Sequence, residues 1–229
     1  MDATTFNNAV LQNMPQLSLV KSLSHLKEEQ RYVDEVLLDR VGLALTRGGI
    51  AEMVGDASVG KTSLALTLLA KLTSEGQICA VVDASHSFDA VTAHQAGIEL
   101  QNLLWIRCGN DVEKAFMSAD YLVQAKGFGA IWLNLSGLSE KKLRMVPKTY
   151  WFRYRTRIKE TPTILLVTAT ETLAGSASQQ SFVISREETR WSGSGKFKLL
   201  REFYIELRSK RDYFSQPVRT RIEMDYSEV

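Results

Sequence analysis

The chain has 229 residues, of which 45% are hydrophobic and 24% are charged, and its formal net charge at pH 7 is only +2. This composition is typical of a globular protein with one sizeable α/β domain and small additions, and it does not indicate a disordered chain. Apolar runs stay below about 18 residues, and residues 1–12 lack the basic and apolar regions of a signal peptide. We therefore expect a cytoplasmic protein without membrane contact. The small net charge does not by itself indicate binding to nucleic acid.

The first predicted element is an amphipathic helix. Apolar residues recur at helical spacing among charged residues from Val20 to Asp39. Residues 40–48 then form a connector. Such a helix packs either on its own domain or on a neighbouring subunit, and the sequence leaves both open.

Residues 49–54 are short and mostly apolar, as in a buried strand, and residues 63–72 have the pattern of a helix. Residues 55–62 between them match the phosphate-loop pattern G-x-x-x-x-G-K-[ST]. Its two glycines let main-chain N–H groups point inward at a helix N-terminus, where they attract phosphate. The alternative is an ordinary glycine-rich turn before a helix.

This loop predicts a site for ATP and Mg²⁺. Lys61 would reach the β- and γ-phosphates, and the Thr62 hydroxyl would be a ligand of the Mg²⁺ that bridges them. The expected nucleotide-binding residues of the loop are Gly55, Asp56, Ala57, Ser58, Val59, Gly60, Lys61, Thr62 and Ser63.

Downstream, apolar strands alternate with helices, which is typical of a parallel sheet with helices on both faces. Strands are expected at residues 77–83, 103–108, 130–135 and 163–168, and helices at residues 86–97, 112–126 and 139–160, the last with a break at Pro147. Residues after 170 alternate like antiparallel strands, and residues 203–207 and 218–224 predict a hairpin.

The sequence therefore predicts an α/β fold with a mainly parallel central sheet, helices on both faces and a C-terminal antiparallel hairpin extension. We expect two parts, which are an N-terminal helix and connector at residues 1–47 and a nucleotide-binding domain at residues 48–229. Cys79 and Cys108 fall in predicted strands, which suits reduced core positions better than a disulfide or a metal site.

Lysine and arginine side chains crowd the segment from Lys141 to Lys159, which also contains aromatic residues at 150–152 and 154. This basic segment is either a solvated helix face or a face for a polyanion or a protein partner.

Residues 49–64, 79–89 and 102–104 resemble, in order and spacing, the core of the bacterial recombinase RecA, and the likeness continues from about residue 48 to the hairpin. Compact RecA-like proteins of the ImuA type, which accompany ImuB and an error-prone polymerase in damage-induced mutagenesis, are the more specific resemblance. The segments that resemble them are the strand Leu104–Arg107, the strand at residues 130–135 with its basic continuation, and the arginine-rich closing hairpin.

The resemblance implies a RecA-like P-loop fold, with the phosphate loop at residues 55–62 and the adenine-contacting aspartate at Asp89. It also reveals three departures. Ser85 stands where the family has its catalytic glutamate, Asn134 where it has the aspartate that holds Mg²⁺ through water, and Ala169 where it has a glutamine that senses the γ-phosphate. Loss of a catalytic base commonly lowers the rate by about 10²- to 10⁴-fold. We therefore expect ATP binding with weak or absent hydrolysis.

Asp83 and Glu52 are candidates for a displaced catalytic carboxylate, although Asp83 equally fits a strand-end aspartate that caps the next turn. Arg208 and Lys210 fall where oligomeric family members present basic residues to the γ-phosphate of a neighbouring subunit. The other interpretation of this pair is an ordinary solvated strand edge, whose charges protect it from aggregation.

The leading hypothesis is a RecA-like nucleotide-binding accessory protein of bacterial DNA repair or damage-induced (SOS) mutagenesis. Its partner would be a RecA filament or an ImuB or error-prone polymerase type of protein. One alternative is an active DNA-dependent RecA-like ATPase, and the other is a RecA-like cell-division inhibitor that acts by protein contact. The basic segment is compatible with weak, non-specific binding of single-stranded DNA, and the resemblance with a homo-oligomer.

Overall fold

The computed structural model describes residues 35–223 except residues 160, 195, 197–198 and 212–215. The first part of the helix predicted over residues 20–39, up to residue 34, lies outside the described residues. Its last part is wrong, because Glu35–Leu38 form strand β1. Val36 and Leu38 are buried while the residues before each of them are exposed, which is the two-residue period of a strand. The predicted connector is also wrong, since Leu43–Thr46 form β2, which pairs with β1.

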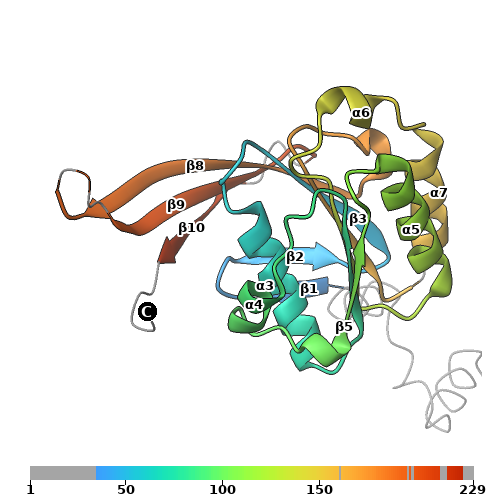
Figure 1. Cartoon of the computed structure of the whole chain (residues 1–229), viewed down its shortest axis with the longest axis horizontal. Coiled ribbons are helices and arrows are strands. Elements are labelled where there is room, and N and C mark those ends of the chain that lie inside the picture. Colours follow the sequence, from blue (N-terminus) through green and yellow to red (C-terminus); the bar gives the residue numbers. More distant parts are fainter. Residues whose placement is uncertain (1–34, 160, 195, 197–198, 212–215, 224–229) are drawn as a thin grey trace, which may run out of the picture. The chain divides into compact units, whose positions relative to one another are not determined.

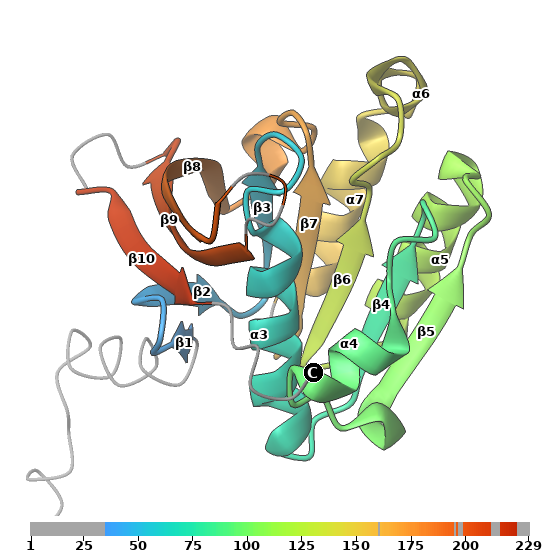
Figure 2. The ribbon, with the colours of Figure 1, turned by 60° about the vertical axis from the view of Figure 1, so that its left-hand side comes forward.

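The main sheet has the strand order β10-β9-β8-β3-β7-β6-β4-β5 among the described residues (Figure 2). Its parallel strands are β3 (Gly49–Val54), β4 (Cys79–Asp83), β5 (Leu103–Arg107), β6 (Ala130–Asn134), β7 (Ile164–Ala169) and β8 (Gln180–Ser192). Strand β9 (Leu199–Ser209) runs antiparallel to β8, and β10 (Val218–Glu223) runs antiparallel to β9. The predicted parallel sheet and closing hairpin are confirmed.

Helices cover the two faces of this sheet (Figure 1). One face carries α3 (Lys61–Ser74) and α4 (Ala90–Gln95), and the other carries α5 (Val112–Ala125), α6 (Glu140–Arg144) and α7 (Thr149–Ile158). Short 3-10 helices are η2 (Leu100–Asn102) and η3 (Gly175–Ala177). The break predicted at Pro147 is confirmed by the gap between α6 and α7. None of the described helices combines the length and the apolar character that a membrane crossing requires.

Side chains of the central strands alternate between two hydrophobic cores. On β6, Trp132 packs in the core beneath α3, whereas Ile131 and Leu133 pack in the core beneath α5. Cys79 and Cys108 are buried, one in each core. Burial raises the pKa of the Cys79 thiol to about 11, so this side chain is an unreactive core residue.

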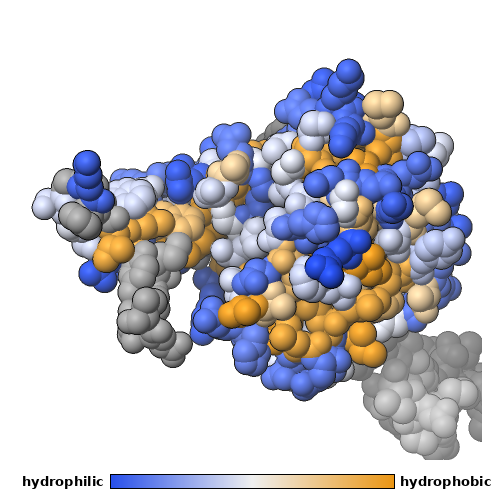
Figure 3. Space-filling model, in the orientation of Figure 1, coloured by the Kyte–Doolittle hydropathy of each residue, from blue (hydrophilic) through white to orange (hydrophobic). Residues whose placement is uncertain are grey.

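Strand β5 is at one edge of the main sheet, and its side chains are only partly covered. Leu104 and Trp105 are 44% and 37% exposed, although Trp105 packs on Phe88 with 5.1 Å between ring centroids. Figure 3 shows apolar atoms gathered on this side of the molecule, over β5 and α4. The covering of the sheet is therefore incomplete at this strand.

The three strands β8, β9 and β10 form a ribbon whose polar face is held by ion pairs. Glu206 lies on the middle strand, and its side chain is only 7% exposed. It accepts hydrogen bonds from Arg219 at 3.0 and 3.1 Å and from Arg208 at 2.7 Å. These two guanidinium groups, Arg219 foremost, hold the pKa of Glu206 below its usual value.

This lowered pKa makes the stability of the ribbon depend on pH. A carboxyl group whose pKa is lowered on folding stabilises the fold fully above its unfolded pKa, about 4.3 for Glu, and loses this effect as the pH falls through the folded value. We expect Glu206→Gln to lower the urea midpoint at neutral pH and the difference from wild type to shrink below about pH 4. The urea midpoints of both proteins are measured by circular dichroism across this pH range. A difference between the two midpoints that does not depend on pH would contradict the prediction.

Candidate functional site

The phosphate-loop sequence connects β3 to α3, the context that its pattern predicts. Gly60 is the residue before α3, and its φ of 97° lies in the left-handed region that favours glycine. At Gly55 a Cβ atom would lie 2.3 Å from the carbonyl oxygen of Ile184 on β8. The loop therefore needs glycine at both places, at Gly60 for its backbone angle and at Gly55 for the close approach of β8.

The exposed surface of the loop consists of polar and small residues. Asp56, Ala57 and Ser58 are exposed, and so are Thr62 and Ser63 in the first turn of α3. No acidic residue occupies that first turn. The start of α3 thus presents hydroxyl groups and the positive end of a helix dipole to the surface.

Lys61 is the one buried cation of the loop, with 6% of its surface exposed. Its Nζ donates hydrogen bonds to the carbonyl oxygens of Gly55 and Asp56, the latter at 2.7 Å. Burial lowers the pKa of this ammonium group, and the nearby Asp56 partly opposes the shift. The loop therefore wraps around a charged group that is largely withdrawn from water.

The hairpin of the ribbon forms one wall of the loop. A Cβ atom on Gly60 would lie 3.5 Å from Ile222 on β10 and 3.6 Å from Ile205 on β9. A cavity of about 630 Å³ lies beside the first two turns of α3, between that helix and β10. Its lining residues are Arg40, Val41, Ser63, Leu64, Thr67, Thr220, Arg221 and Ile222.

Asp83 ends β4 and lies in register with Asn134 on β6, which in turn lies beside Thr168 on β7. The carboxylate of Asp83 is fully buried and accepts hydrogen bonds from the main-chain amides of Ser87 and Phe88, each at 3.1 Å. Both of its oxygens therefore cap the turn after β4, as the second interpretation of Asp83 predicts.

Asn134 belongs to a neutral hydrogen-bond network at the ends of β6 and β7. Its Nδ2 donates to Ser87 at 2.7 Å, and its Oδ1 accepts from the Thr168 hydroxyl at 3.0 Å. Trp132 donates to the same hydroxyl at 3.0 Å, and the Ser85 hydroxyl donates to the carbonyl oxygen of Ser136 at 2.7 Å. Positions 85 and 134, where the resemblance to RecA implies carboxylates, are thus filled by uncharged groups that already have partners.

Glu52, the other proposed carboxylate, is fully buried on β3. Its Oε1 accepts hydrogen bonds from the amides of Leu173 and Ala174 at 2.6 and 2.9 Å, and its Oε2 accepts from the Ser181 hydroxyl at 3.3 Å. Ala169, where the resemblance to RecA implies a sensor glutamine, ends β7 and is buried. Glu52 therefore ties the loop after β7 to the sheet.

Asp89 is the N-cap of α4, on the same face of the sheet as α3. Its carboxylate accepts hydrogen bonds from the hydroxyl and the amide of Thr92 at 2.6 and 2.8 Å, and these bonds lower its pKa. The sequence predicted that this helix begins at His86, which is wrong. The cap explains why α4 begins at Ala90 instead. Asp89 is exposed and ionised near neutral pH.

Arg208 lies at the end of β9, Lys210 directly follows that strand, and both are exposed. Arg208 forms an ion pair with Glu206 at 2.7 Å, and Lys210 donates to the Thr172 hydroxyl at 2.5 Å. Arg208 stands in register with Val183, which pairs with Val54 at the end of β3. Both cations therefore lie two strands away from the strand that leads into the phosphate loop.

The sequence patterns missed Ser87 and Thr168, which join the strand ends into one network. The spacing of Asp83 and Ser87 is a usable signal, because an aspartate commonly bonds main-chain amides shortly after it. Thr168 gave no such signal, since its partner Asn134 is distant in the sequence. Among the described residues, no group of three His, Cys, Asp or Glu side chains gathers as a metal site.

Comparison with known proteins agrees with this geometry. The family model described as the RecA N-terminal domain matches residues 33–136, which include the phosphate loop and strands β1 to β6. Protein RecA of Rhizobium leguminosarum bv. viciae is 46% identical over 81 residues, and Protein RecA of Rhizobium rhizogenes strain K84 is 44% identical over 81 residues. The part of the chain over residues 33–136 is therefore RecA-like.

The RecA-like match is partial on both sides. The aligned residues make up 35% of this chain but only 23% and 22% of the two relatives, so the chain spans less than a quarter of their length. The RecA-like part contains Asp83, Ser85 and Asn134, whereas α6, α7 and the ribbon follow after residue 136.

Proposed function

We propose that this RecA-like chain is a nucleotide-binding accessory protein of bacterial DNA repair or damage-induced mutagenesis that binds ATP and hydrolyses it slowly or not at all. One observation carries the proposal. A glycine-dependent phosphate loop joins β3 to α3, while the neighbouring strand ends present Ser85, Asn134 and Ala169, which are all uncharged.

The residues of the loop fit a triphosphate. Gly55 and Gly60 keep side chains out of the cradle, and Lys61 has its ammonium group inside the loop. Thr62 is exposed at the helix start, so its hydroxyl is available to Mg²⁺, and Asp89 is available to an adenine. A bound Mg–ATP would supply the negative phosphates that compensate the buried Lys61 cation.

Slow hydrolysis follows from the state of the carboxylates. A serine or an asparagine does not accept a proton from water at neutral pH, and absence of a general base typically lowers the rate by about 10²- to 10⁴-fold. Asp83 and Glu52 do not substitute, because each uses both oxygens as hydrogen-bond acceptors within the fold. This argues against the active ATPase as the main function.

The cellular role is inferred from the family. A RecA-like domain without its own catalytic groups suits a protein that acts by contact, in the cytoplasm, with a RecA filament or an ImuB or error-prone polymerase type of partner. In this proposal residues 48–229 are the nucleotide-binding domain, and Arg208 and Lys210 would serve a neighbouring nucleotide in a homo-oligomer. Contact with single-stranded DNA would be weak and non-specific.

The proposal is tested by separating binding from hydrolysis. We expect the full-length chain to bind a fluorescent ATP analogue in an anisotropy titration with Mg²⁺. Steady-state release of phosphate should remain below about 0.1 per second, with and without single-stranded DNA, compared with typical enzymes at about 10 per second. Faster turnover would support the ATPase instead, and no binding would remove the nucleotide from the proposal.

A further inference from the structure

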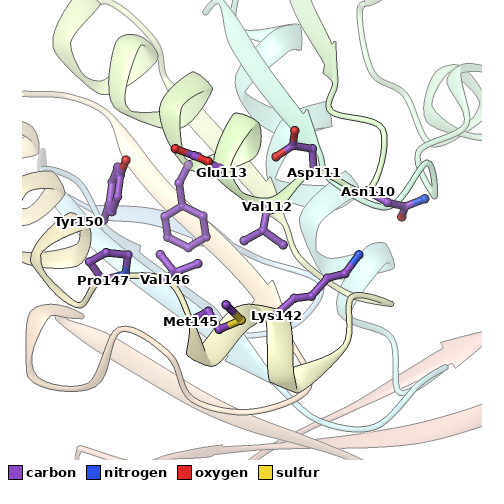
Figure 4. Close-up of a pocket in the computed structure, with 10 residues that line it drawn as sticks. Asn110, Asp111, Val112, Glu113, Lys142, Met145, Val146, Pro147 and Tyr150 are labelled. Atoms are coloured by element: carbon purple, nitrogen blue, oxygen red, sulfur yellow. The ribbon is translucent and has the colours of Figure 1, made fainter.

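A second cavity, of about 700 Å³, lies between the first turn of α5 and the link that joins α6 to α7. It is on the opposite face of the sheet from α3 and is separate from the phosphate loop. Figure 4 shows Lys142 and Met145 on one side and Asp111 and Glu113 on the other. The lining residues are Asn110, Asp111, Val112, Glu113, Phe116, Lys142, Met145, Val146, Pro147 and Tyr150.

The apolar floor of the cavity is braced by aromatic packing. The rings of Phe116 and Tyr150 meet edge to face with 5.5 Å between centroids, and Phe116 also contacts Trp151 at 5.0 Å. The guanidinium group of Arg153 lies 4.4 Å from the centre of the Tyr150 ring on α7. The floor is therefore a preformed surface, which suits the entry of a large apolar side chain.

The rim includes an exposed methionine. α6 ends at Arg144 and α7 begins at Thr149. Met145 therefore lies in the segment between the two helices, which also contains Pro147. Met145 is 77% exposed, the largest exposure among the large hydrophobic residues that the structure describes. An unbranched, polarisable side chain at such a place adapts to the shape of a bound partner.

The charges around the cavity are unevenly compensated. Arg144 pairs with Glu140 and Glu171, and both Arg153 and Arg157 pair with Asp120. In contrast, three exposed lysines of the same segment have no carboxylate within 4.0 Å among the described residues. These lysines are Lys141, Lys142 and Lys148. The arginines thus brace the fold, while the lysines are free to meet an external negative charge.

From this combination we infer that the cavity is a docking site for a short acidic segment of a partner protein. One or two large apolar side chains of the segment enter between Phe116 and Met145, and its carboxylates lie against the α6 lysines. Asp111 and Glu113 repel carboxylates from the opposite rim and so orient the segment. This site lies away from the phosphate loop, and its test uses no nucleotide. A failure of the docking inference can therefore be distinguished from a failure of the proposed nucleotide binding.

Single-stranded DNA is the competing ligand for these lysines, but the geometry favours a peptide. A DNA backbone tracks a continuous positive groove, and here two acidic side chains stand on the far rim. An apolar floor and an exposed methionine match the anchor side chains of a peptide.

The test uses a short fluorescein-labelled peptide with four aspartates followed by Leu-Phe, and the full-length chain, in anisotropy titrations. We expect binding that weakens about tenfold in Lys142→Glu and several-fold in Met145→Ser, the range of charged and apolar anchors at interfaces. Because both side chains are exposed, the variants should keep the fold, which circular dichroism verifies. Lys196→Glu, on the turn between β8 and β9, is the matched charge control and should bind like wild type.

Two peptide changes complete the design. Replacing Leu-Phe by Ser-Ser should abolish the effect of Met145→Ser, and replacing the aspartates by asparagine should abolish the effect of Lys142→Glu. Absence of binding, or equal binding of the Ser-Ser peptide, would overturn the inference. An oligothymidine that binds more tightly than the peptide, and whose binding falls in Lys142→Glu but not in Met145→Ser, would identify a DNA site instead.

Discussion

Lys61→Ala is expected to lower the affinity of the chain for ATP about a hundredfold, which corresponds to about 2.7 kcal/mol. The Nζ atom of Lys61 lies inside the phosphate loop, 2.7 Å from the carbonyl oxygen of Asp56. A buried ammonium group that gains phosphate oxygens forms charge-assisted hydrogen bonds, the strong kind in a site withdrawn from water. Alanine removes the charge and leaves Asp56 to repel the phosphates. Titration with a fluorescent ATP analogue measures the loss.

Lys71→Ala is the matched control for this variant. Lys71 lies on the same helix, and its partly exposed side chain pairs with Asp39 at 3.4 Å, away from the loop. It should bind the analogue with wild-type affinity. Retained binding in Lys61→Ala, with a wild-type melting temperature, would show that the loop does not hold the phosphates.

Glu52→Ala is expected to destabilise the fold by about 3 kcal/mol, the upper range for a buried group left without its partner. The Glu52 side chain is fully buried, and it is the acceptor for the amides of Leu173 and Ala174. Alanine would leave both amides, of which the Ala174 amide is buried, without this acceptor and would add a cavity, which also costs stability. The free energy of unfolding is measured by urea titration monitored by circular dichroism.

Glu52→Gln separates structure from chemistry at the same position. The glutamine keeps one carbonyl oxygen for the two amides, so we expect a loss of about 1 kcal/mol, similar to one ordinary hydrogen bond. Its low ATPase rate should equal that of wild type. A variant that is stable but loses a measurable turnover would identify Glu52 as the displaced base and would contradict its structural role.

The parallel core was predictable because each strand is a short apolar run followed by a helix with a clear end. Asp89 and Gly97 frame α4, and Pro147 separates α6 from α7. The connection of β3 to α3 by the phosphate-loop sequence was predictable for the same reason, since its pattern depends on neighbours in the sequence.

The parts that escaped prediction depend on distant contacts. β1 and β2 are only four residues each, and they are strands because Val36, Leu38, Leu43 and Leu45 enter the core beneath α3. The position of β8 beside β3 is set by pairing across the sheet, which no local pattern reveals.

The site shows the same division. Ser85 and Asn134 were named from the resemblance to RecA, but their hydrogen-bond partners were not predicted. That Asp83 and Glu52 are engaged within the fold emerges only when residues 87–88 and 173–174 are brought against them. A sequence identifies a carboxylate, whereas its freedom to act depends on tertiary structure.

The approach of the ribbon to both glycines of the phosphate loop has a mechanical consequence. Ile184 on β8 abuts Gly55, while Ile205 and Ile222 on the other two strands abut Gly60. A macromolecule that binds and bends this three-stranded ribbon would displace the residues that contact the phosphate loop. Its binding would therefore change the affinity of the loop for nucleotide. By thermodynamic reciprocity, nucleotide in the loop would change the affinity of the ribbon for that macromolecule by the same factor. The ribbon would then transmit the occupancy of the loop to a distant binding partner.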